Sequence, residues 1–386
     1  MHPSIKNSIN KTRVLQEIRK EKGISRIEIS KILGLDKSTI SKITSDLLEE
    51  GLIIDKKTEE ELNHAGRRRI GLSLNNNYGV ILGLEIQTEY FNAVIINLHG
   101  DILLNYREEL PEGDLLTSID KLLEKVIKKT EDEFDKLLGI GIGIPGLIDP
   151  YKGIIIQSKP LNINTSLELY SYLNKKYTYP IFIDNDANCC CWGELTFSLG
   201  KRDNNFLVVL GEKRPININD KQQRSIVVGI GIVIDGKVLI GDNFSAGEFR
   251  SIYWNNSNNT QFSITDDEAE NAIDNMDITL KVIKELQKQI ALFVNTFNIT
   301  KVIYTGFFTD YKLDTKRILE NEIENNWGYD LQKNTNINFS TFGDYDVSYG
   351  AAGLIVEKLF TTPDISFNGD RNSLKGIDLF NYISNS

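Results

Sequence analysis

The stretch GISRIEISKILGLDKSTISKITSDLLEEGLI, residues 23–53, decides the fold of the front of this chain. Ser25 followed three residues later by Glu28 predicts a capping box at the start of a helix, and Gly34 predicts the tight turn at its end. Asp36 then predicts the N-cap of a second helix, whose apolar residues recur at three- and four-residue spacing. A short helical pattern from about Lys11 to Lys22 precedes the pair. Together these segments predict a helix-turn-helix.

The outward face of the second helix has the composition expected of a DNA-reading surface. In a helix-turn-helix this helix enters the major groove, where short polar and basic side chains meet bases and phosphates. An ordinary solvated helix face is also polar, so the composition alone leaves both interpretations open. The predicted DNA contacts are Lys37, Ser38, Thr39, Ser41, Lys42, Thr44 and Ser45.

The next segment favours DNA binding. Residues 52–75, LIIDKKTEEELNHAGRRRIGLSLN, have the pattern of a strand, a loop and a strand. Such a hairpin is typical of the wing that follows a helix-turn-helix. Arg67, Arg68 and Arg69 beside Gly66 suit insertion into a narrow minor groove or contact with the phosphate backbone. They are therefore predicted DNA contacts.

Charge is distributed unevenly along the 386 residues, whose formal net charge is -10. Residues 1–75 hold 15 Lys and Arg against 11 Asp and Glu, whereas the remainder holds 29 against 43. A mildly basic head can approach phosphates while an acidic body stays away from them. No apolar run is long enough to span a bilayer, and the first residues lack the apolar stretch of a signal peptide, so we expect a cytoplasmic protein with no membrane contact.

From residue 78 onwards, apolar strands alternate with helical patterns and glycine loops, which favours an α/β body. Five motifs in it resemble the ROK family of repressors, open reading frames and sugar kinases: GIGIPGLID (141–149), IDNDAN (183–188), IVIDGKVLIG (232–241), AGEFRS (246–251) and GAAGLIVEKLF (350–360). The resemblance implies an actin-like, hexokinase-like body of two lobes around a cleft. With the winged helix-turn-helix in front, it covers nearly the whole chain.

The resemblance also predicts the domain limits. The winged helix-turn-helix, α-helical with a small β-wing, is expected at 1–75 and the ROK domain at 76–386. Within the ROK domain, lobe 1 is expected at about 78–190 together with the C-terminal helix at about 347–360, and lobe 2 at about 191–345.

The phosphate-binding loops depart from the family pattern. Family kinases carry Asp-x-Gly-Gly-Thr after the first strand, because bare backbone there lets N–H groups approach the phosphates. This chain has Glu85, Ile86, Gln87, Thr88 and Glu89 instead, and the second loop keeps few of its glycines. A polar stretch at 211–224 also looks like an insertion. We therefore expect no ATP binding, no catalytic residues and no cofactor.

The sugar side of the family pattern is better kept. Asn185 and Asp186 match the family's Asn-Asp pair, whose carboxylate accepts a proton from a sugar hydroxyl. Asn188 follows in the same loop, and Glu248 matches a glutamate that binds the sugar ring. Helix capping is an alternative role for Asp186 and Asn188 that is compatible with sugar contact. The predicted sugar contacts are Asn185, Asp186, Asn188, Glu248 and Ser251.

Ser251 stands where family members usually carry a histidine that contacts sugar and binds zinc. No cysteine or histidine follows in the next segment, so we predict no metal site. The three cysteines of the chain, Cys189, Cys190 and Cys191, are consecutive, which excludes a disulfide framework and predicts small buried side chains.

The sequence thus predicts a sugar-responsive transcriptional regulator, a repressor. A homodimer, or a tetramer, would read a palindromic operator in double-stranded DNA, and a small sugar between the lobes would alter the spacing of the heads. Two alternatives stay open. One is a ROK sugar kinase with a regulatory DNA-binding head. The other is a DNA-binding regulator whose ROK body is a dimerisation scaffold.

Overall fold

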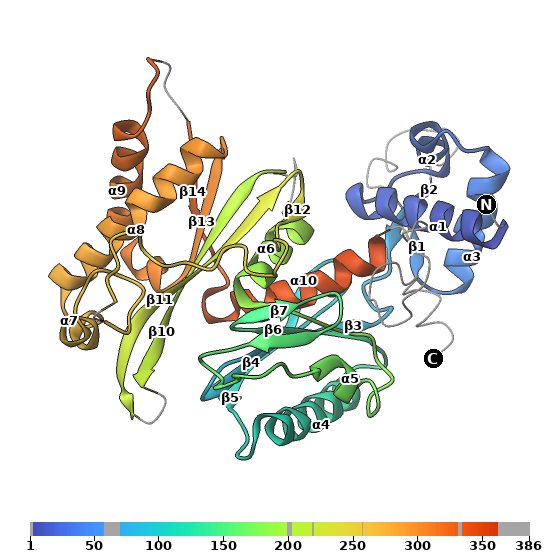
Figure 1. Cartoon of the computed structure of the whole chain (residues 1–386). Helices are drawn as coiled ribbons and strands as arrows, with labels where there is room; N and C mark the ends of the chain where they lie inside the picture. The colour runs from blue at the N-terminus through green and yellow to red at the C-terminus, as the bar shows by residue number, and fades with distance from the viewer. Residues whose placement is uncertain are drawn as a thin grey trace.

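The head is a three-helix unit with a β-hairpin, as the sequence predicts. The structure, a computed structural model, describes residues 3–57, 70–198, 203–217, 220–256, 258–330 and 334–361. The elements of the head are α1 (Pro3–Lys20), α2 (Arg26–Leu33), α3 (Lys37–Glu49), β1 (Ile53–Lys57) and β2 (Ile70–Leu74). Strands β1 and β2 pair antiparallel, which confirms the two strands of the predicted wing (Figure 1).

Local signals set the ends of these helices. Ser25 and Glu28 form the predicted capping box, and Gly34 ends α2 in the left-handed conformation at φ 64°. Asp36 occupies the N-cap position of α3, although its side chain makes no capping hydrogen bond. Because helix ends are fixed by such short-range contacts, they are readable from sequence.

The body contains two five-stranded sheets of the same design. The first has the order β5-β4-β3-β6-β9 and the second the order β12-β11-β10-β13-β14. In each sheet, three antiparallel strands are followed by two that lie parallel to the third. The first sheet comprises β3 (Val80–Ile86), β4 (Tyr90–Ile96), β5 (Ile102–Glu109), β6 (Leu137–Ile144) and β9 (Ile181–Asn185). The second comprises β10 (Phe206–Asn217), β11 (Asp220–Ile234), β12 (Lys237–Val238), β13 (Lys301–Gly306) and β14 (Asn336–Phe339).

Helices cover both faces of each sheet. The helices of the body are α4 (Leu115–Glu133), α5 (Leu169–Leu173), α6 (Asp186–Phe197), α7 (Asp266–Asn271), α8 (Met276–Thr296), α9 (Lys312–Asn325) and α10 (Asp346–Phe360). Two short strands, β7 (Leu147–Asp149) and β8 (Ile154–Gln157), pair with each other, and short 3-10 helices span Phe307–Tyr311 and Gly343–Tyr345. In the described part of the chain, no helix is both long and apolar enough to cross a membrane.

Helices α6 and α10 pack together between the two sheets (Figure 1). Glycines make this contact possible. A Cβ on Gly350 of α10 would lie 1.9 Å from the carbonyl oxygen of Cys189 in α6, and one on Gly141 of β6 would lie 1.9 Å from that of Ala351. Without side chains at these two positions, α10 packs closely against α6 and β6. The cysteines beside them are free and buried, as predicted.

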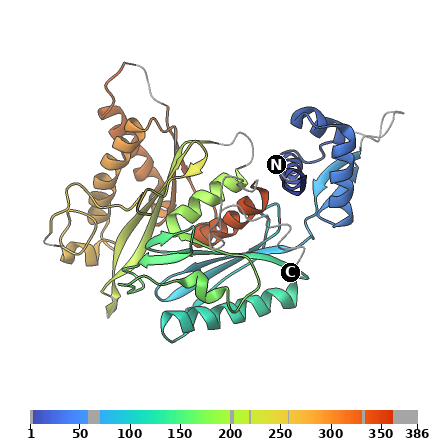
Figure 2. The same ribbon diagram turned by 45° about the vertical axis from the view of Figure 1, so that its right-hand side comes forward.

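The head rests on the ends of the same two helices (Figures 1 and 2). Arg19 in α1 donates to the carbonyl oxygen of Thr196 at the end of α6, at 2.6 Å. It also lies 3.9 Å from the carboxylate of Glu357 and over the ring of Phe360, both in α10. Gln16 donates to the carbonyl oxygen of Phe360 at 2.6 Å. Both helices begin at the centre of the body, so they connect it to the head.

Two local expectations need correction. The first helix of the head begins at Pro3, well before the predicted start at about Lys11. Strand β9 runs into α6 with no loop between them, because Asn185 ends the strand and caps the helix. The described residues of the polar stretch that looks like an insertion, 211–217 and 220–224, belong to the long antiparallel pair of β10 and β11. The predicted lobe limits stay a prediction, and they assign the first sheet to one lobe and the second to the other.

Candidate functional site

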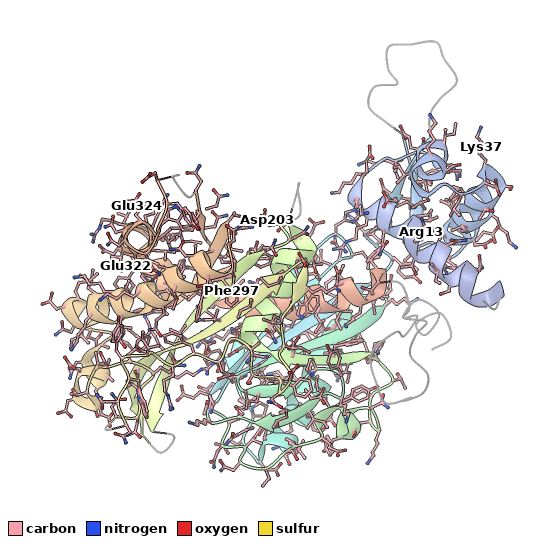
Figure 3. The ribbon with its side chains drawn as sticks, turned by 45° about the horizontal axis from the view of Figure 1, so that its top comes forward. Arg13, Lys37, Asp203, Phe297, Glu322 and Glu324 are labelled. Carbon is pink, nitrogen blue, oxygen red and sulfur yellow. The ribbon has the colours of Figure 1, made fainter. Side chains whose placement is uncertain are left out.

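The outward face of α3 is exposed where DNA contact is predicted. Lys37, Ser38, Ser41, Lys42 and Ser45 are exposed and Thr39 is half-buried. Lys37 lies at the outer end of the head, on the side away from the body (Figure 3). This face is therefore accessible to a duplex.

The structure contradicts the prediction that Thr44 contacts DNA. Its side chain is 0% exposed, and its hydroxyl donates to the carbonyl oxygen of Ile40 at 2.9 Å. It also accepts a hydrogen bond from Nε of Arg26 in α2, at 3.0 Å. Thr44 thus joins the two helices of the motif and has no surface to offer DNA. The predicted contacts Arg67, Arg68 and Arg69 lie outside the described residues.

In the body, Asp186 and Glu248 converge on one glycine. Gly229 of β11 forms an antiparallel β-bridge with Glu248. A Cβ on Gly229 would lie 3.9 Å from Oδ1 of Asp186. Burial raises the pKa of Glu248, although solvent still reaches it, and the negative charge of Asp186 raises it further. Two predicted sugar contacts from distant parts of the sequence therefore face one site.

Asn185 and Asn188 are tied into the framework around Asp186. The side-chain oxygen of Asn185 accepts hydrogen bonds from the backbone N–H of Ala187 and Asn188, and its amide nitrogen donates to the carbonyl oxygen of Gly146 at 3.0 Å. Asn188 is 7% exposed and donates to the buried carboxylate of Asp184 at 3.0 Å. The helix cap therefore belongs to Asn185, whereas the alternative weighed from the sequence was capping by Asp186 or Asn188.

The structure also contradicts the prediction that Ser251 contacts the sugar. It is 5% exposed, and its hydroxyl accepts hydrogen bonds from Gln289 of α8 and from the backbone N–H of Tyr253, both at 3.1 Å. A side chain held in this way has no surface to offer a sugar. No group of three or more His, Cys, Asp or Glu within the described residues is arranged to hold a metal ion.

The side chains of the predicted first phosphate loop, which follows β3, are held by hydrogen bonds. The amide nitrogen of Gln87 donates at 2.8 Å to Glu85 of β3 and at 2.8 Å to Glu212 of β10. Thr88 donates to the carbonyl oxygen of Pro160. Burial and the nearby charge of Glu212 raise the pKa of Glu85 to about 8. At neutral pH, Glu85 therefore largely holds its proton.

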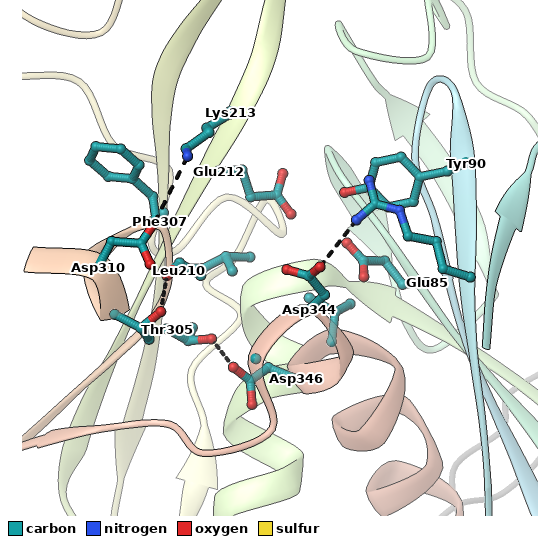
Figure 4. Close-up of a pocket in the computed structure, with 16 residues that line it drawn as sticks. Glu85, Tyr90, Leu210, Glu212, Lys213, Thr305, Phe307, Asp310, Asp344 and Asp346 are labelled. Carbon is teal, nitrogen blue, oxygen red and sulfur yellow. Dashed lines mark hydrogen bonds and ion pairs between the residues drawn. The ribbon is translucent and has the colours of Figure 1, made fainter. Parts of the chain in front are cut away.

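A cavity of about 240 Å³ continues from Glu85 between the two sheets (Figure 4). Its carboxylates are those of Glu85, Glu212, Asp310, Asp344 and Asp346. Its two cations are already paired with carboxylates: Lys213 lies 3.9 Å from Asp310, and Arg107 lies 3.3 Å from Asp344. The lining is therefore acidic.

The remaining glycines of the second loop serve helix packing. A Cβ on Gly231 would lie 2.2 Å from Sγ of Cys191 and 2.6 Å from the carbonyl oxygen of Ala187, both in α6. The same atom on Gly229 would lie 3.3 Å from Cβ of Ala187. These glycines let β11 approach the first turns of α6.

Sequence reasoning missed Arg214. Its guanidinium contacts Oδ2 of Asp186 at 2.6 Å and Oε2 of Glu212 at 2.5 Å. Burial alone lowers the pKa of Arg214, but the charges of Glu212 and Asp186 outweigh that effect and raise it. The alternation of side chains along β10 could have indicated its position. Phe206, Val208 and Leu210 pack beside α6, and residues 212 and 214 continue the same face of the strand.

Comparison with known families identifies both parts of the chain. Residues 81–260 match the ROK family, and residues 8–54 match the winged helix-turn-helix DNA-binding family. The chain carries a ROK family domain behind a winged helix-turn-helix. The predicted family and fold class are thereby confirmed.

Curated relatives share about a quarter to a third of the aligned residues. The xylose repressor of Caldicellulosiruptor bescii is 32% identical over 245 residues, which are 62% of this chain and 57% of the repressor. The xylose repressor of Bacillus subtilis is 29% identical over 243 residues, 62% of this chain and 59% of the repressor. The DNA-binding transcriptional dual regulator NagC of Escherichia coli is 24% identical over 247 residues, 63% of this chain and 57% of NagC. The matches span less than two thirds of the length of these relatives.

Solved structures agree on the fold. A ROK family transcriptional regulator, a homolog of the E. coli MLC protein, matches with a TM-score of 0.75 and 22% identity over 99% of this chain and 100% of its own. A ROK family glucokinase from Streptomyces griseus, in complex with glucose and AMPPNP, matches with a TM-score of 0.54 and 16% identity over 72% of this chain and 99% of its own. At these identities, the similarity establishes the architecture alone.

Proposed function

We propose that this protein is a sugar-responsive transcriptional regulator, a repressor, that binds a small sugar in the interlobe cleft without phosphorylating it. The observation that carries the proposal is the convergence of Asp186 and Glu248 on Gly229, together with the hydrogen bond of the Gln87 side chain to Glu212. The exposed polar face of α3 supports the DNA-binding half. The curated relatives named above as repressors support the same assignment.

Carbohydrate recognition fits this geometry. A sugar presents several hydroxyl donors, and carboxylates accept such hydrogen bonds strongly because the acceptor is charged. Asp186 and Glu248 supply two carboxylates. Asn185 and Asn188 hold the start of α6 in place, so they also position Asp186 for contact with a sugar.

The rival assignment, a sugar kinase with a regulatory head, has less support. Phosphoryl transfer depends on backbone N–H groups and cations placed around the nucleotide phosphates. The corresponding space contains the amide of Gln87 and several carboxylates, whose charges repel a triphosphate. The retained Gly229 and Gly231 have a packing role that needs no nucleotide.

Helices α6 and α10 offer a route from the cleft to the head. Asp186 begins α6 and Asp346, which lines the cavity, begins α10. The other ends of the two helices meet Arg19 and Gln16 of α1. A change in lobe angle that moves either helix therefore displaces the head. Coupling requires that the sugar prefer one lobe arrangement, and typical couplings change affinity about 5- to 150-fold.

The proposal includes the partners and the compartment. Double-stranded operator DNA is read by two heads of a homodimer, or of a tetramer, because a palindromic site mirrors a two-fold axis. The protein acts in the cytoplasm, where sugar and DNA are both accessible.

Three measurements on the full-length protein test this function. Selection from a random duplex library identifies a bound DNA sequence. Thermal unfolding against a panel of sugars and sugar phosphates identifies the effector, because a ligand that binds the native state raises apparent stability. Incubation with ATP and the same sugars measures turnover. We expect sequence-selective DNA binding, a stability shift with a sugar, and no phosphorylated product; turnover would instead establish the kinase.

The second alternative, a body that acts as a dimerisation scaffold, gives a different result. In that case the protein binds DNA selectively while no sugar shifts its unfolding temperature. The loss of the family histidine at Ser251 is the observation that favours this alternative.

A further inference from the structure

The extended β10–β11 pair places a charged side chain inside the proposed sugar site. Ser225 of β11 pairs with Arg214 of β10, and the two strands stay paired beyond this point. Because side chains alternate along a strand, Glu212 and Arg214 lie on the face of β10 that also carries Leu210, which packs in the cluster around α6. This face turns toward the start of α6.

Arg214 is held by two carboxylates. Its Nη2 atom lies 2.6 Å from Oδ2 of Asp186 and 2.5 Å from Oε2 of Glu212. The Arg214 side chain is 20% exposed, and those of Asp186 and Glu212 are 6% and 12% exposed. Charge-assisted hydrogen bonds among groups this well buried are far less weakened by solvent than exposed ion pairs are. Arg214 therefore binds the carboxylate of Asp186, which the proposed function assigns to the sugar.

The ion pair also links the two lobes. Glu212 and Arg214 belong to the second sheet, whereas Asp186 follows β9 of the first sheet directly. A second link lies alongside, since Gln87, which directly follows β3, donates to Oε1 of Glu212 at 2.8 Å. Oδ1 of Asp186 already accepts a hydrogen bond from the backbone N–H of Ala187. A sugar hydroxyl that binds Oδ2 must therefore share it with Arg214 or replace Arg214.

We propose that Arg214 is a built-in competitor of the effector: it holds Asp186 in the unliganded form, and a neutral sugar replaces it there. This inference rests on the proposed function for the position of the sugar. Release of Arg214 from Asp186 removes one of the links between β10 and α6. Binding is thereby coupled to the relative position of the lobes.

The charges around Arg214 define the class of the effector. Glu212 keeps the guanidinium neutralised after its release, so Arg214 does not become an anion site. Asp186 and Glu248 face the position that Arg214 leaves, and their negative charges repel a phosphate or a carboxylate. The effector is therefore an uncharged sugar, and neither a sugar phosphate nor a sugar acid binds in its place.

Isothermal titration of the full-length protein tests both the competitor role of Arg214 and the class of the effector. The neutral probes are glucose, xylose and N-acetylglucosamine, and the charged probes are glucose 6-phosphate and glucuronate. The variants are Arg214→Met, which keeps an unbranched side chain like the aliphatic part of arginine but removes the charge, and the double variant Arg214→Met with Glu212→Gln, which also removes a carboxylate left unpaired. If the ion pair closes the site for nine tenths of the time, its loss tightens sugar binding about tenfold, because apparent affinity scales with the open fraction.

The outcomes separate the two proposals. Tighter binding of a neutral sugar by a folded variant, with no binding of the charged probes, supports the competitor role. Weaker binding by both variants, each with a cooperative thermal transition, overturns that role but leaves the sugar-responsive function standing. Tighter binding of glucose 6-phosphate than of glucose by the wild type overturns the effector class. If no sugar binds the wild type or either variant while DNA binding persists, the proposed sugar site and the competitor role both fail.

Discussion

Replacement of Arg19 by methionine is expected to separate sugar binding from DNA release. Arg19 joins the head to the last turns of α6 and α10 through Thr196, Glu357 and Phe360. Arg19→Met keeps an unbranched side chain like the aliphatic part of arginine and removes its charge and its donors. The apolar cluster that includes residues of both head and body remains, so the variant should fold.

The size of the effect follows from the three contacts. A hydrogen bond from a charged donor contributes about 1.5–3 kcal/mol. The ion pair at 3.9 Å contributes at most about 1 kcal/mol, and the contact with the ring of Phe360 about 0.5–1 kcal/mol. These contributions are not additive, and we expect the head to lose about 2–3 kcal/mol of attachment to the body. Since typical allosteric couplings amount to about 1–3 kcal/mol, this loss is sufficient to abolish most of the coupling.

Fluorescence anisotropy with a labelled DNA duplex, with and without saturating sugar, measures the coupling. We expect Arg19→Met to bind DNA and sugar separately, but to show a much smaller effect of sugar on DNA affinity than the wild type. Arg13→Met is the matched control, because Arg13 lies on the same helix and donates to the carbonyl oxygen of Leu33 inside the head (Figure 3). An unchanged sugar effect in folded Arg19→Met, or an equal loss in Arg13→Met, would refute the role of Arg19.

Three further predictions concern packing, protonation and DNA contact. Gly350→Ala places a Cβ 1.9 Å from a carbonyl oxygen of α6 and should lower the unfolding free energy, measured by chemical denaturation, by at least about 1–3 kcal/mol. Gly353→Ala, whose Cβ would have its nearest contact at 3.1 Å, should lower it less, and equal losses would contradict the packing argument. The pKa of Glu85 is about 8 in the folded state against an ordinary value of 4.5, so between pH 4.5 and 8 the folded state keeps a proton that the unfolded state has lost, and the stability that this group contributes falls as pH rises. Glu85→Gln should remove this part of the dependence of the unfolding free energy on pH, and an unchanged pH dependence would contradict the protonation of Glu85. Lys42→Ala removes an exposed charge, so it should weaken DNA binding and reduce its salt dependence without lowering the unfolding temperature. Thr44→Val removes a buried hydrogen-bonding group, so it should lower the unfolding temperature, and the reverse pattern would contradict the placement of these side chains.

Short-range features were readable from the sequence because neighbouring residues determine them. The capping box of Ser25 and Glu28 and the left-handed turn at Gly34 depend on residues within one helical turn. The overall order of strands and helices followed from five motifs that resemble one family. Thr44 was misassigned because helical periodicity placed it near the boundary between the exposed and buried faces, and Arg26, which binds it, lies on another helix.

The interior of the cleft was less predictable because it depends on contacts between distant residues. Arg214 reaches Asp186 across 28 positions, and Gln87 reaches Glu212 across 125. A polar stretch between two strands gives little indication that one of its residues neutralises the proposed sugar carboxylate. Alternation along β10 would have placed Arg214 on the correct face, but its partner is determined by the packing of α6 against β11.

The most direct test of the account is the sugar dissociation constant of the full-length protein, measured by isothermal titration in the absence and in the presence of saturating operator duplex. Thermodynamic reciprocity requires that a sugar that alters DNA affinity have its own affinity altered by the same factor. We predict that the operator duplex changes the sugar dissociation constant by about 5- to 150-fold, as for typical couplings, and that Asp186→Asn abolishes the sugar binding isotherm. Equal sugar affinities with and without DNA would contradict the account.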